Sequence, residues 1–251
     1  MNKFNFDLTT ISDLPDCPPV SYYKTGEPNF DRDYQGICKT GLTLIGAYPA
    51  HGKSLFTLDL AIKMAQNNPN LSVYYFSCEN DPSDDLDRIK WLYPHLELPA
   101  NQFHYMNLIG FEDWESGLET IRNTTQECIV FIDAPSVIIE DAPTEREAMV
   151  KLIRRLTKIS MNHPLVTNWH LQRPSQNNKS MREEDVFKNL TGNNFAETNE
   201  TYKKASYCFF VDYQGGFIMD VRCGKYRGKK TRDDITDSGE DAYISKFSIG
   251  E

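Results

Sequence analysis

The sequence predicts an α/β fold in which a mostly parallel β-sheet is flanked by helices on both faces. From Gly41 onward, short apolar runs alternate with segments of helical periodicity. Strands that alternate with helices form parallel sheets whose two faces are covered. Near the C-terminus, two apolar runs flank a Gln-Gly-Gly turn, which is a hairpin signature. We therefore expect antiparallel strands at the C-terminal edge of the sheet.

The expected elements follow one another in a single domain at residues 34–251, after an N-terminal arm or linker. Residues 1–33 contain four prolines and no clear periodicity, which is typical of irregular chain. Apolar residues recur on one face of the segments expected as helices, and β-branched and aromatic runs mark the strands. The expected strands are residues 42–46, 73–77, 103–108, 128–133, 165–169, 206–213, 217–223 and 242–247. The expected helices are residues 54–66, 84–93, 114–122 and 144–160.

Composition excludes several classes of protein. The 251 residues suffice for one large domain, and 39% hydrophobic and 25% charged residues are ordinary globular values. No apolar run approaches the ~20 residues that span a bilayer. The N-terminus has no basic start followed by an apolar stretch, so it is no secretory signal. We expect a cytoplasmic protein with no membrane partner.

Charge and cysteines limit the partners further. The formal net charge of −9 argues against a protein that coats nucleic acid with its whole surface, but it leaves room for a local basic loop. No cysteine pair is spaced as CxxC, and the histidines show no metal-ligand spacing. We expect reduced, mostly buried thiols. The six cysteines are Cys17, Cys38, Cys78, Cys128, Cys208 and Cys223.

The strongest chemical signal is a phosphate-binding loop. The usual pattern is G-x-x-x-x-G-K-[ST] between a strand and a helix, and here alanine replaces the first glycine. Backbone N–H groups at the helix start would cradle phosphates, Lys53 would neutralise the β/γ oxygens, and the Ser54 hydroxyl would bind Mg²⁺. The alternative is an ordinary turn with a surface lysine. The loop consists of Ala47, Tyr48, Pro49, Ala50, His51, Gly52, Lys53 and Ser54.

Three further candidates end predicted strands, where open α/β sheets bind ligands. Asp133 ends a buried strand that we expect beside the phosphate-loop strand, and it would hold the Mg²⁺ shell. Glu79 would polarise the attacking water as general base, or it is a solvated loop acid. His170 would touch the γ-phosphate, or it is a hydrogen-bonded strand-end histidine.

A basic cluster follows the last hairpin strand. Lys225 and Arg227 lead into Gly228, Lys229 and Lys230. Such a cluster is usually a solvated face. The alternative is an arginine finger that reaches the nucleotide of a neighbouring subunit.

These motifs together resemble the RecA-like motor domain of DnaB-type hexameric replicative helicases. That family includes the helicase halves of phage primase–helicases and the mitochondrial replicative helicase. The likeness runs from about Tyr23 to the C-terminus. It is carried by residues 24–31 (KTGEPNFD), 47–54 (AYPAHGKS), 76–79 (FSCE), 131–133 (FID), 169–173 (WHLQR) and 225–227 (KYR).

The resemblance implies a RecA-like P-loop ATPase that forms a homo-oligomeric, hexameric ring and translocates on single-stranded DNA in replication. It implies ATP or another NTP or dNTP as substrate, Mg²⁺ as cofactor, and a separate primase or loader as partner. A phage or plasmid gene in a bacterial host is compatible with it. It also implies that Glu79 is catalytic, that His170 senses the γ-phosphate, and that Lys225 and Arg227 act on the neighbouring subunit's nucleotide.

The DNA-binding loop that the resemblance implies lies at residues 171–188. Its candidate contacts are Arg173, Lys179, Arg182 and Lys188, but three acids at residues 183–185 lower its charge. Residues 189–192 read Asn-Leu-Thr-Gly where the family often has Asp-Leu-Arg-Gly. Two rival functions stay open: a RecA-fold ATPase that acts as recombination mediator or helicase-loading factor without unwinding, and a non-catalytic binding module.

Overall fold

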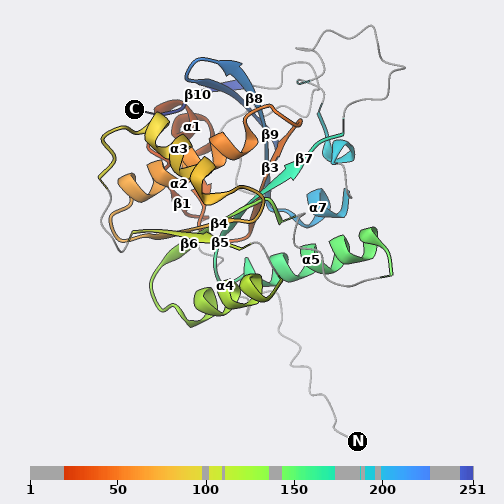
Figure 1. Cartoon of the computed structure of the whole chain (residues 1–251). Helices are drawn as coiled ribbons and strands as arrows, with labels where there is room; N and C mark the ends of the chain where they lie inside the picture. The colour runs from red at the N-terminus through yellow and green to blue at the C-terminus, as the bar shows by residue number, and fades with distance from the viewer. Residues whose placement is uncertain are drawn as a thin grey trace, which may run out of the picture.

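A computed structural model of the chain describes residues 20–97, 102–108, 111–135, 143–172, 187, 190–195, 199–226 and 244–250. Its centre is an eight-stranded sheet in the order β10-β9-β8-β3-β7-β6-β4-β5 (Figure 1). All neighbouring pairs from β8 to β5 are parallel, and β9 and β10 are antiparallel to their neighbours. The predicted fold class is therefore confirmed, including the antiparallel strands at the C-terminal edge.

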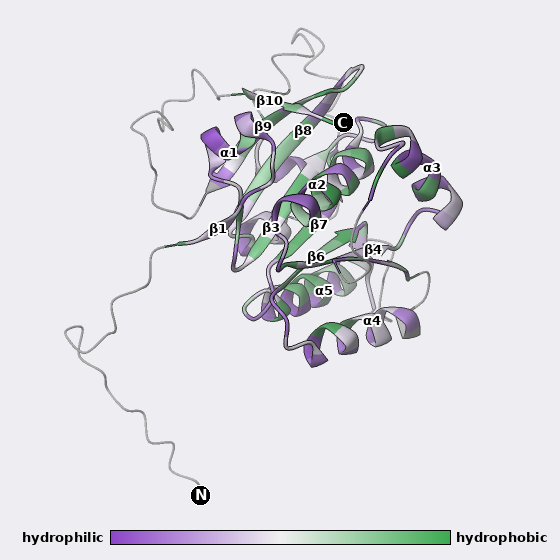
Figure 2. Cartoon of the chain, turned by 90° about the vertical axis from the view of Figure 1, so that its left-hand side faces the viewer, coloured by the Kyte–Doolittle hydropathy of each residue, from purple (hydrophilic) through white to green (hydrophobic). Residues whose placement is uncertain are grey.

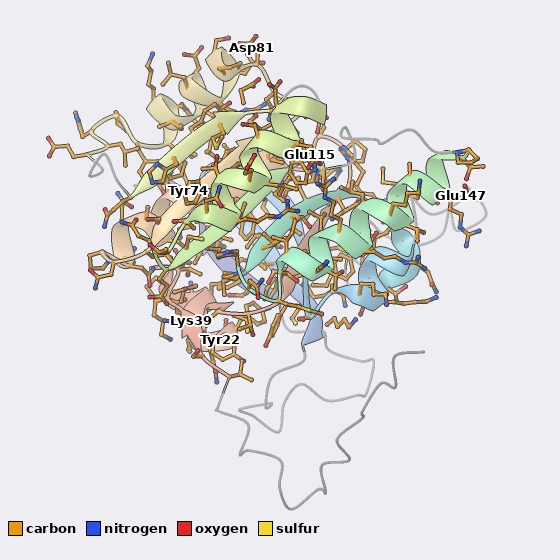
Figure 3. All side chains as sticks on the ribbon, turned by 90° about the horizontal axis from the view of Figure 1, so that it is seen from below. Tyr22, Lys39, Tyr74, Asp81, Glu115 and Glu147 are labelled. Atoms are coloured by element: carbon orange, nitrogen blue, oxygen red, sulfur yellow. The ribbon has the colours of Figure 1, made fainter. Side chains whose placement is uncertain are left out.

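The strands and helices have the following bounds. The strands of the large sheet are β3 (Leu42–Ala47), β4 (Ser72–Ser77), β5 (Phe103–Asn107), β6 (Cys128–Asp133), β7 (Leu165–His170), β8 (Tyr207–Gly215), β9 (Ile218–Tyr226) and β10 (Ile244–Ser248). The helices are α1 (Pro28–Tyr34), α2 (Lys53–Asn67), α3 (Pro82–Leu92), α4 (Phe111–Asn123), α5 (Glu145–Ile159) and α7 (Asn199–Lys204), with a 3-10 turn η4 (Gly192–Asn194). A separate two-stranded sheet pairs β1 (Tyr22–Tyr23) with β2 (Ile37–Cys38), where Tyr22 and Lys39 lie side by side (Figure 3).

Helices cover both faces of the sheet, so the protein has two apolar cores. Helices α1, α2 and α3 lie on one side and α4 and α5 on the other (Figure 2). Because successive side chains of a strand point to opposite faces, β4 sends Val73 and Tyr75 into the first core and Tyr74 and Phe76 into the second. A strand that is buried on both faces is apolar throughout, which explains why no polar alternation marks it.

The N-terminal boundary differs from the expectation of an irregular arm up to residue 33. Residues 28–34 form helix α1, with Pro28 in its first turn, where the missing N–H of proline costs no helical hydrogen bond. Phe30 and Tyr34 are 0% and 4% exposed and belong to the first core. The folded body therefore already includes residues 22–34, whereas residues 1–19 lie outside the described part.

The described cysteines agree with the expectation of reduced, mostly buried thiols. Cys38, Cys78, Cys128 and Cys208 are buried free thiols and Cys223 is half-buried, while Cys17 lies outside the described residues. Within the described ranges, every helix is too short or too polar to cross a lipid bilayer.

Candidate functional site

The predicted phosphate-binding loop joins β3 to α2 at the carboxyl edge of the sheet. Ala50 and Gly52 have left-handed backbone, with φ of 66° and 75°. Such residues turn neighbouring N–H groups to one side and form a concave anion site. Gly52 also packs closely, because a Cβ there would lie 3.1 Å from the Cβ of Tyr213. Two left-handed residues in one turn are compatible with the predicted phosphate-binding loop, whose role stays a prediction.

Lys53 is the first residue of α2 and brings three predicted site residues together. Its side chain is 6% exposed. Its Nζ lies 3.2 Å from Oδ1 of Asp133 and 3.9 Å from Oε2 of Glu79. The loop, the end of β6 and the segment after β4 thus converge on one ammonium group.

Asp133 is fully buried at the end of β6 and is held by four donors. Besides Lys53, Asn168 Nδ2 donates to its Oδ1 at 2.7 Å, Tyr75 Oη donates to its Oδ2 at 3.0 Å, and Ser54 also hydrogen-bonds to it. Burial alone would raise the pKa of this carboxyl, but the charge of Lys53 and the hydrogen bonds outweigh it and lower the pKa below its ordinary value. Asp133 is therefore a carboxylate inside the protein.

One expectation about Asp133 was wrong, namely that its strand lies beside the phosphate-loop strand. Strand β7 lies between β3 and β6 and pairs with both. Lys53 reaches Asp133 across β7, because α2 starts above the end of the sheet. The intervening strand contributes Asn168, a contact of Asp133 that the motifs did not indicate. Its signal in the sequence is a polar pair, Thr167-Asn168, inside an apolar run.

Glu79 and His170 complete the cluster on its more open side. Oε2 of Glu79 lies 3.9 Å from Nε2 of His170, and their side chains are 41% and 31% exposed. Burial, followed by the nearby charge of Lys53, lowers the pKa of His170 and favours its neutral form. Glu79 is the most exposed member, so it is the carboxylate that water reaches most easily.

The segment that carries Glu79 is anchored from two sides. Asp81 caps α3 by accepting a hydrogen bond from the backbone N–H of Ser83 at 2.8 Å, and Figure 3 shows Asp81 at this end of the helix. In the next turn, buried Asp85 accepts a hydrogen bond from Ser77 Oγ at 2.7 Å. These contacts join α3 to the end of β4 and fix the path of residues 78–81.

His51 of the phosphate loop has a partner that sequence reasoning missed. Its Nδ1 lies 2.5 Å from Oδ1 of Asp212 on β8. Its ring also packs edge-on against Tyr48, with centroids 5.6 Å apart. The middle of the loop is thereby attached to the strand next to β3.

The oxygen donors at this site fit a magnesium ion. Asp133 is ionised, and the Ser54 hydroxyl lies in hydrogen-bond contact with it. Among the described residues no group of three or more His, Cys, Asp or Glu could hold a metal. Mg²⁺ commonly binds through one or two carboxylates together with substrate phosphates and needs no larger cluster. The assignment of Ser54 and Asp133 to Mg²⁺ stays a prediction.

Lys225 lies apart from this cluster. Its Nζ donates to the carbonyl oxygens of Tyr202 at 2.6 Å and Lys203 at 3.0 Å, so it caps the C-terminal end of α7. Its predicted contact with a neighbour's nucleotide stays a prediction. The other candidates lie outside the described residues: Arg227, Arg173, Lys179, Arg182 and Lys188.

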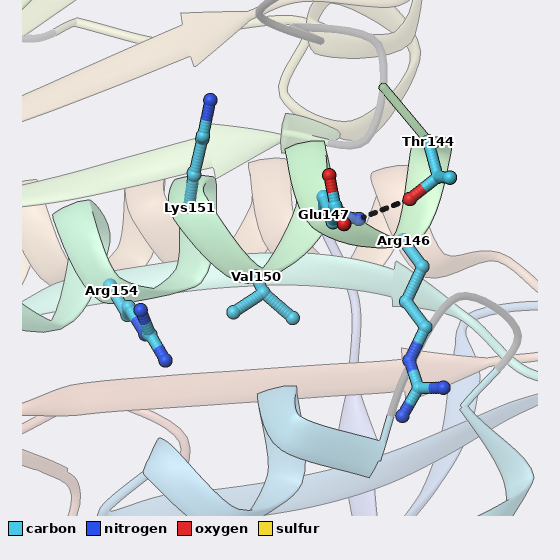
Figure 4. A pocket seen from close by; sticks show the side chains of 6 residues that line it. All are labelled: Thr144, Arg146, Glu147, Val150, Lys151 and Arg154. Carbon is cyan, nitrogen blue, oxygen red and sulfur yellow. Dashed lines mark hydrogen bonds between the residues drawn. The ribbon is translucent and has the colours of Figure 1, made fainter. Parts of the chain in front are cut away.

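A hollow of about 490 Å³ lies along the start of α5, away from the phosphate loop (Figure 4). Its walls carry three cations, one carboxylate, a threonine and a valine. Mixed charges of this kind are ordinary on an exposed helix face, so the hollow adds nothing to the site. Its lining residues are Thr144, Arg146, Glu147, Val150, Lys151 and Arg154.

Comparison with known proteins identifies the family to which this fold belongs. Residues 23–189, more than half of the chain, match the family described as DnaB-like helicase C terminal domain. The fold resembles a solved structure described as an ATPase domain, with a TM-score of 0.66 and 16% identity over 91% of this chain and 87% of that one.

A second structure, described as "The Structure Of A DnaB-Like Replicative Helicase And Its Interactions With Primase", gives a TM-score of 0.67 and 15% identity. The alignment covers 93% of this chain but 62% of that one, so this chain spans less than two thirds of its length. No curated protein matches the chain. The resemblance carried by the motifs is confirmed by the family match: the chain belongs to the family of DnaB-like helicase C-terminal domains.

Proposed function

We propose that this chain is the ATP-hydrolysing motor of a ring-forming DNA helicase that translocates on single-stranded DNA during replication. The observation that carries the proposal is the convergence of Lys53, Glu79, Asp133 and His170 at the end of a phosphate-binding loop. Phosphoryl transfer depends mainly on positioning and charge stabilisation, and these four side chains supply both. Membership of the helicase family supports the DNA substrate and the ring.

Each residue has a distinct part in the proposed reaction. Lys53 binds the β/γ oxygens of the nucleotide, while Ser54 and Asp133 hold Mg²⁺. The ion, when bound, neutralises charge on the phosphate oxygens. Glu79 takes the proton of the attacking water as general base. Neutral His170 contacts the γ-phosphate region through Nε2, which lies next to Glu79.

A phosphate-release assay tests the chemistry. Lys53→Ala should abolish hydrolysis, because the nucleotide loses its main protein cation. Glu79→Gln should bind ATP normally and turn over at least about 10²-fold more slowly, as expected for a lost general base. Lys90→Ala is the matched control, since Lys90 is 65% exposed on α3 and lies outside the cluster. Near wild-type hydrolysis by Lys53→Ala would refute the phosphate-loop assignment.

Strand displacement on a forked duplex tests the helicase activity. The wild type with ATP should release the displaced strand, and Glu79→Gln should not. ATP hydrolysis without displacement, on forks of either polarity, would favour the rival function of a recombination mediator or helicase loader.

Subunit mixing tests whether hydrolysis occurs at subunit interfaces. If Arg227 acts on the neighbour's nucleotide, Lys53→Ala and Arg227→Ala are each inactive alone. In an equal mixture about one interface in four would pair an intact loop with an intact arginine, if sites in the head-to-tail ring act independently. Native mass spectrometry, with and without nucleotide and single-stranded DNA, gives the subunit number and shows exchange. If subunits exchange but hydrolysis is not recovered, either Arg227 acts on the nucleotide of its own subunit, or one inactive site stops the whole ring. Titration of Lys53→Ala into wild type then separates the two: a steep loss of hydrolysis indicates that one inactive site stops the ring, and a linear loss contradicts the action of Arg227 on its neighbour.

A further inference from the structure

Strand β7 carries a buried amide side chain between two cores that are mostly apolar. Asn168 is 0% exposed and lies opposite Ile45 of β3. Its side chain touches two polar partners, Asp133 at the end of β6 and Thr57 in the second turn of α2. A buried amide is costly unless it is hydrogen-bonded, and this one is bonded at both ends.

The chemistry of Asp133 fixes the direction of these hydrogen bonds. An ionised carboxylate only accepts hydrogen bonds, so Asn168 must turn its Nδ2 to Oδ1 of Asp133, 2.7 Å away. Its Oδ1 then faces Thr57, whose Oγ1 lies 2.5 Å away. Since this oxygen can only accept, the Thr57 hydroxyl is the donor. The chain of hydrogen bonds therefore runs from α2 through β7 to β6.

Thr57 lies one helical turn after Lys53 in α2. Its Oγ1 is 3.0 Å from the carbonyl oxygen of Lys53, but its one hydroxyl hydrogen is donated to Asn168, so the helix backbone joins Thr57 to Lys53. Thr57 is itself 0% exposed. The first turns of α2, the Thr57 hydroxyl, the Asn168 amide and the Asp133 carboxylate thus connect the phosphate loop with the end of β6.

We propose that Thr57 and Asn168 are positioning residues that fix the Asp133 carboxylate relative to the phosphate loop, and that tight binding of the magnesium–nucleotide depends on them. The inference rests on the proposed function and deepens it. Neither residue touches the substrate in this arrangement. They act by holding Oδ1 of Asp133, while Tyr75 holds Oδ2, so that the two oxygens together have a fixed orientation.

Calorimetric titration with the non-hydrolysable analogue AMP-PNP, in Mg²⁺ and in EDTA, separates positioning from general stability. Asn168→Leu removes the donor to Asp133 and the acceptor for Thr57. It should weaken binding in Mg²⁺ by roughly 10- to 100-fold, as for other residues that orient metal ligands, and leave binding in EDTA as in wild type. Thermal unfolding of each variant reports whether it is folded.

Two substitutions at Thr57 provide a conservative pair. Thr57→Val keeps the shape but loses the hydroxyl, so it should weaken Mg²⁺-dependent binding in the same way. Thr57→Ser keeps the hydroxyl and should bind AMP-PNP in Mg²⁺ as tightly as wild type does. The double variant Asn168→Leu/Thr57→Val should be no weaker than Asn168→Leu alone, because both act through one chain. If Asn168→Leu does not fold, the valine–serine comparison still decides.

Thr167→Val is the matched control on the same strand. Thr167 is equally buried, but its Oγ1 accepts from Trp169 Nε1 at 2.8 Å and takes no part in the chain. It should bind AMP-PNP as wild type does in both buffers. Equal losses in Mg²⁺ and EDTA for Asn168→Leu, or no loss in either, would overturn the inference. Failure of the wild type to bind more tightly with Mg²⁺ would instead overturn the proposed function.

Discussion

Replacement of Lys53 by alanine tests whether this lysine compensates a buried charge as well as binding phosphate. Lys53 Nζ lies 3.2 Å from a carboxylate that is 0% exposed. In the variant, Asp133 keeps its hydrogen bonds from Asn168, Tyr75 and Ser54 but loses the ammonium group. The prediction is that Lys53→Ala is less stable than wild type near neutral pH.

The structure sets the size of this loss. Removal of one partner of a buried ion pair costs about 3–5 kcal/mol, because the other charge is left without its counterion. Three hydrogen-bond donors to Asp133 remain, so the lower end, about 3 kcal/mol, is expected. For a chain of this size the midpoint of thermal unfolding should then fall by roughly 6–12 °C.

The loss should depend on pH in a defined direction. In wild type the folded-state pKa of Asp133 is below its ordinary value of 3.8. Ionisation of Asp133 therefore stabilises the folded protein fully above pH 3.8, and this contribution is lost as the pH falls through the folded-state pKa. Without Lys53 the largest cause that lowers this pKa is gone, so the folded-state pKa of Asp133 should be higher than in wild type. The folded variant then takes up a proton at a higher pH than the folded wild type, and its deficit should shrink as pH falls.

Urea unfolding of wild type, Lys53→Ala and the double variant Lys53→Ala/Asp133→Asn measures the effect. The double variant should recover part of the lost stability near neutral pH, since it buries no carboxylate charge. Lys90→Ala, a change at an exposed lysine, should match wild type. Wild-type stability of Lys53→Ala near neutral pH, or a deficit that does not shrink as pH falls, would refute the reasoning.

Three further outcomes follow from single contacts or charges. Removal of the charges of Arg173, Lys179 and Lys188 should weaken single-strand binding and flatten its dependence on salt, measured by fluorescence anisotropy, because fewer counterions are released; an unchanged slope would place the DNA path elsewhere. Burial lowers the folded-state pKa of His170 below its ordinary value of 6.5, so the unfolded chain takes up the proton first and protonation favours unfolding. As pH falls below 6.5, the free energy of unfolding measured in urea should therefore decrease less for His170→Gln than for wild type. Ala50→Gly should raise the free energy of unfolding by about 1 kcal/mol, because the left-handed conformation strains alanine.

The sequence predicted the parts of the site that local patterns encode. Lys53, Glu79, Asp133 and His170 each follow a recognisable strand at its carboxyl end, and the structure brings all four together. The hairpin was equally easy to predict, because Gly216, the first residue of the turn between β8 and β9, adopts a positive φ, which tight hairpin turns favour.

Strand order could not be read in the same way. The insertion of β7 between β3 and β6 depends on how the crossover helices pack, and no local pattern records it. Helix α1 was missed because its 7 residues follow a proline-rich segment, although Phe30 and Tyr34 are spaced for one helix face. Asn168 and Asp212 were missed because single polar residues inside strands match no motif.

The strand order has a consequence for how Asp133 can serve two purposes. A carboxylate accepts about four hydrogen bonds, and Lys53, Ser54, Asn168 and Tyr75 already supply four donors. Two of these donors belong to the phosphate loop and, in the proposed function, turn to the nucleotide and its ion. The other two, Asn168 in β7 and Tyr75 in β4, are buried inside the sheet. In the proposed function, nucleotide binding would therefore exchange the two donors of the phosphate loop while Asn168 and Tyr75 hold the carboxylate in place. For this reason we expect loss of Asn168 to change the magnesium dependence, whereas loss of Lys53 changes stability and hydrolysis together.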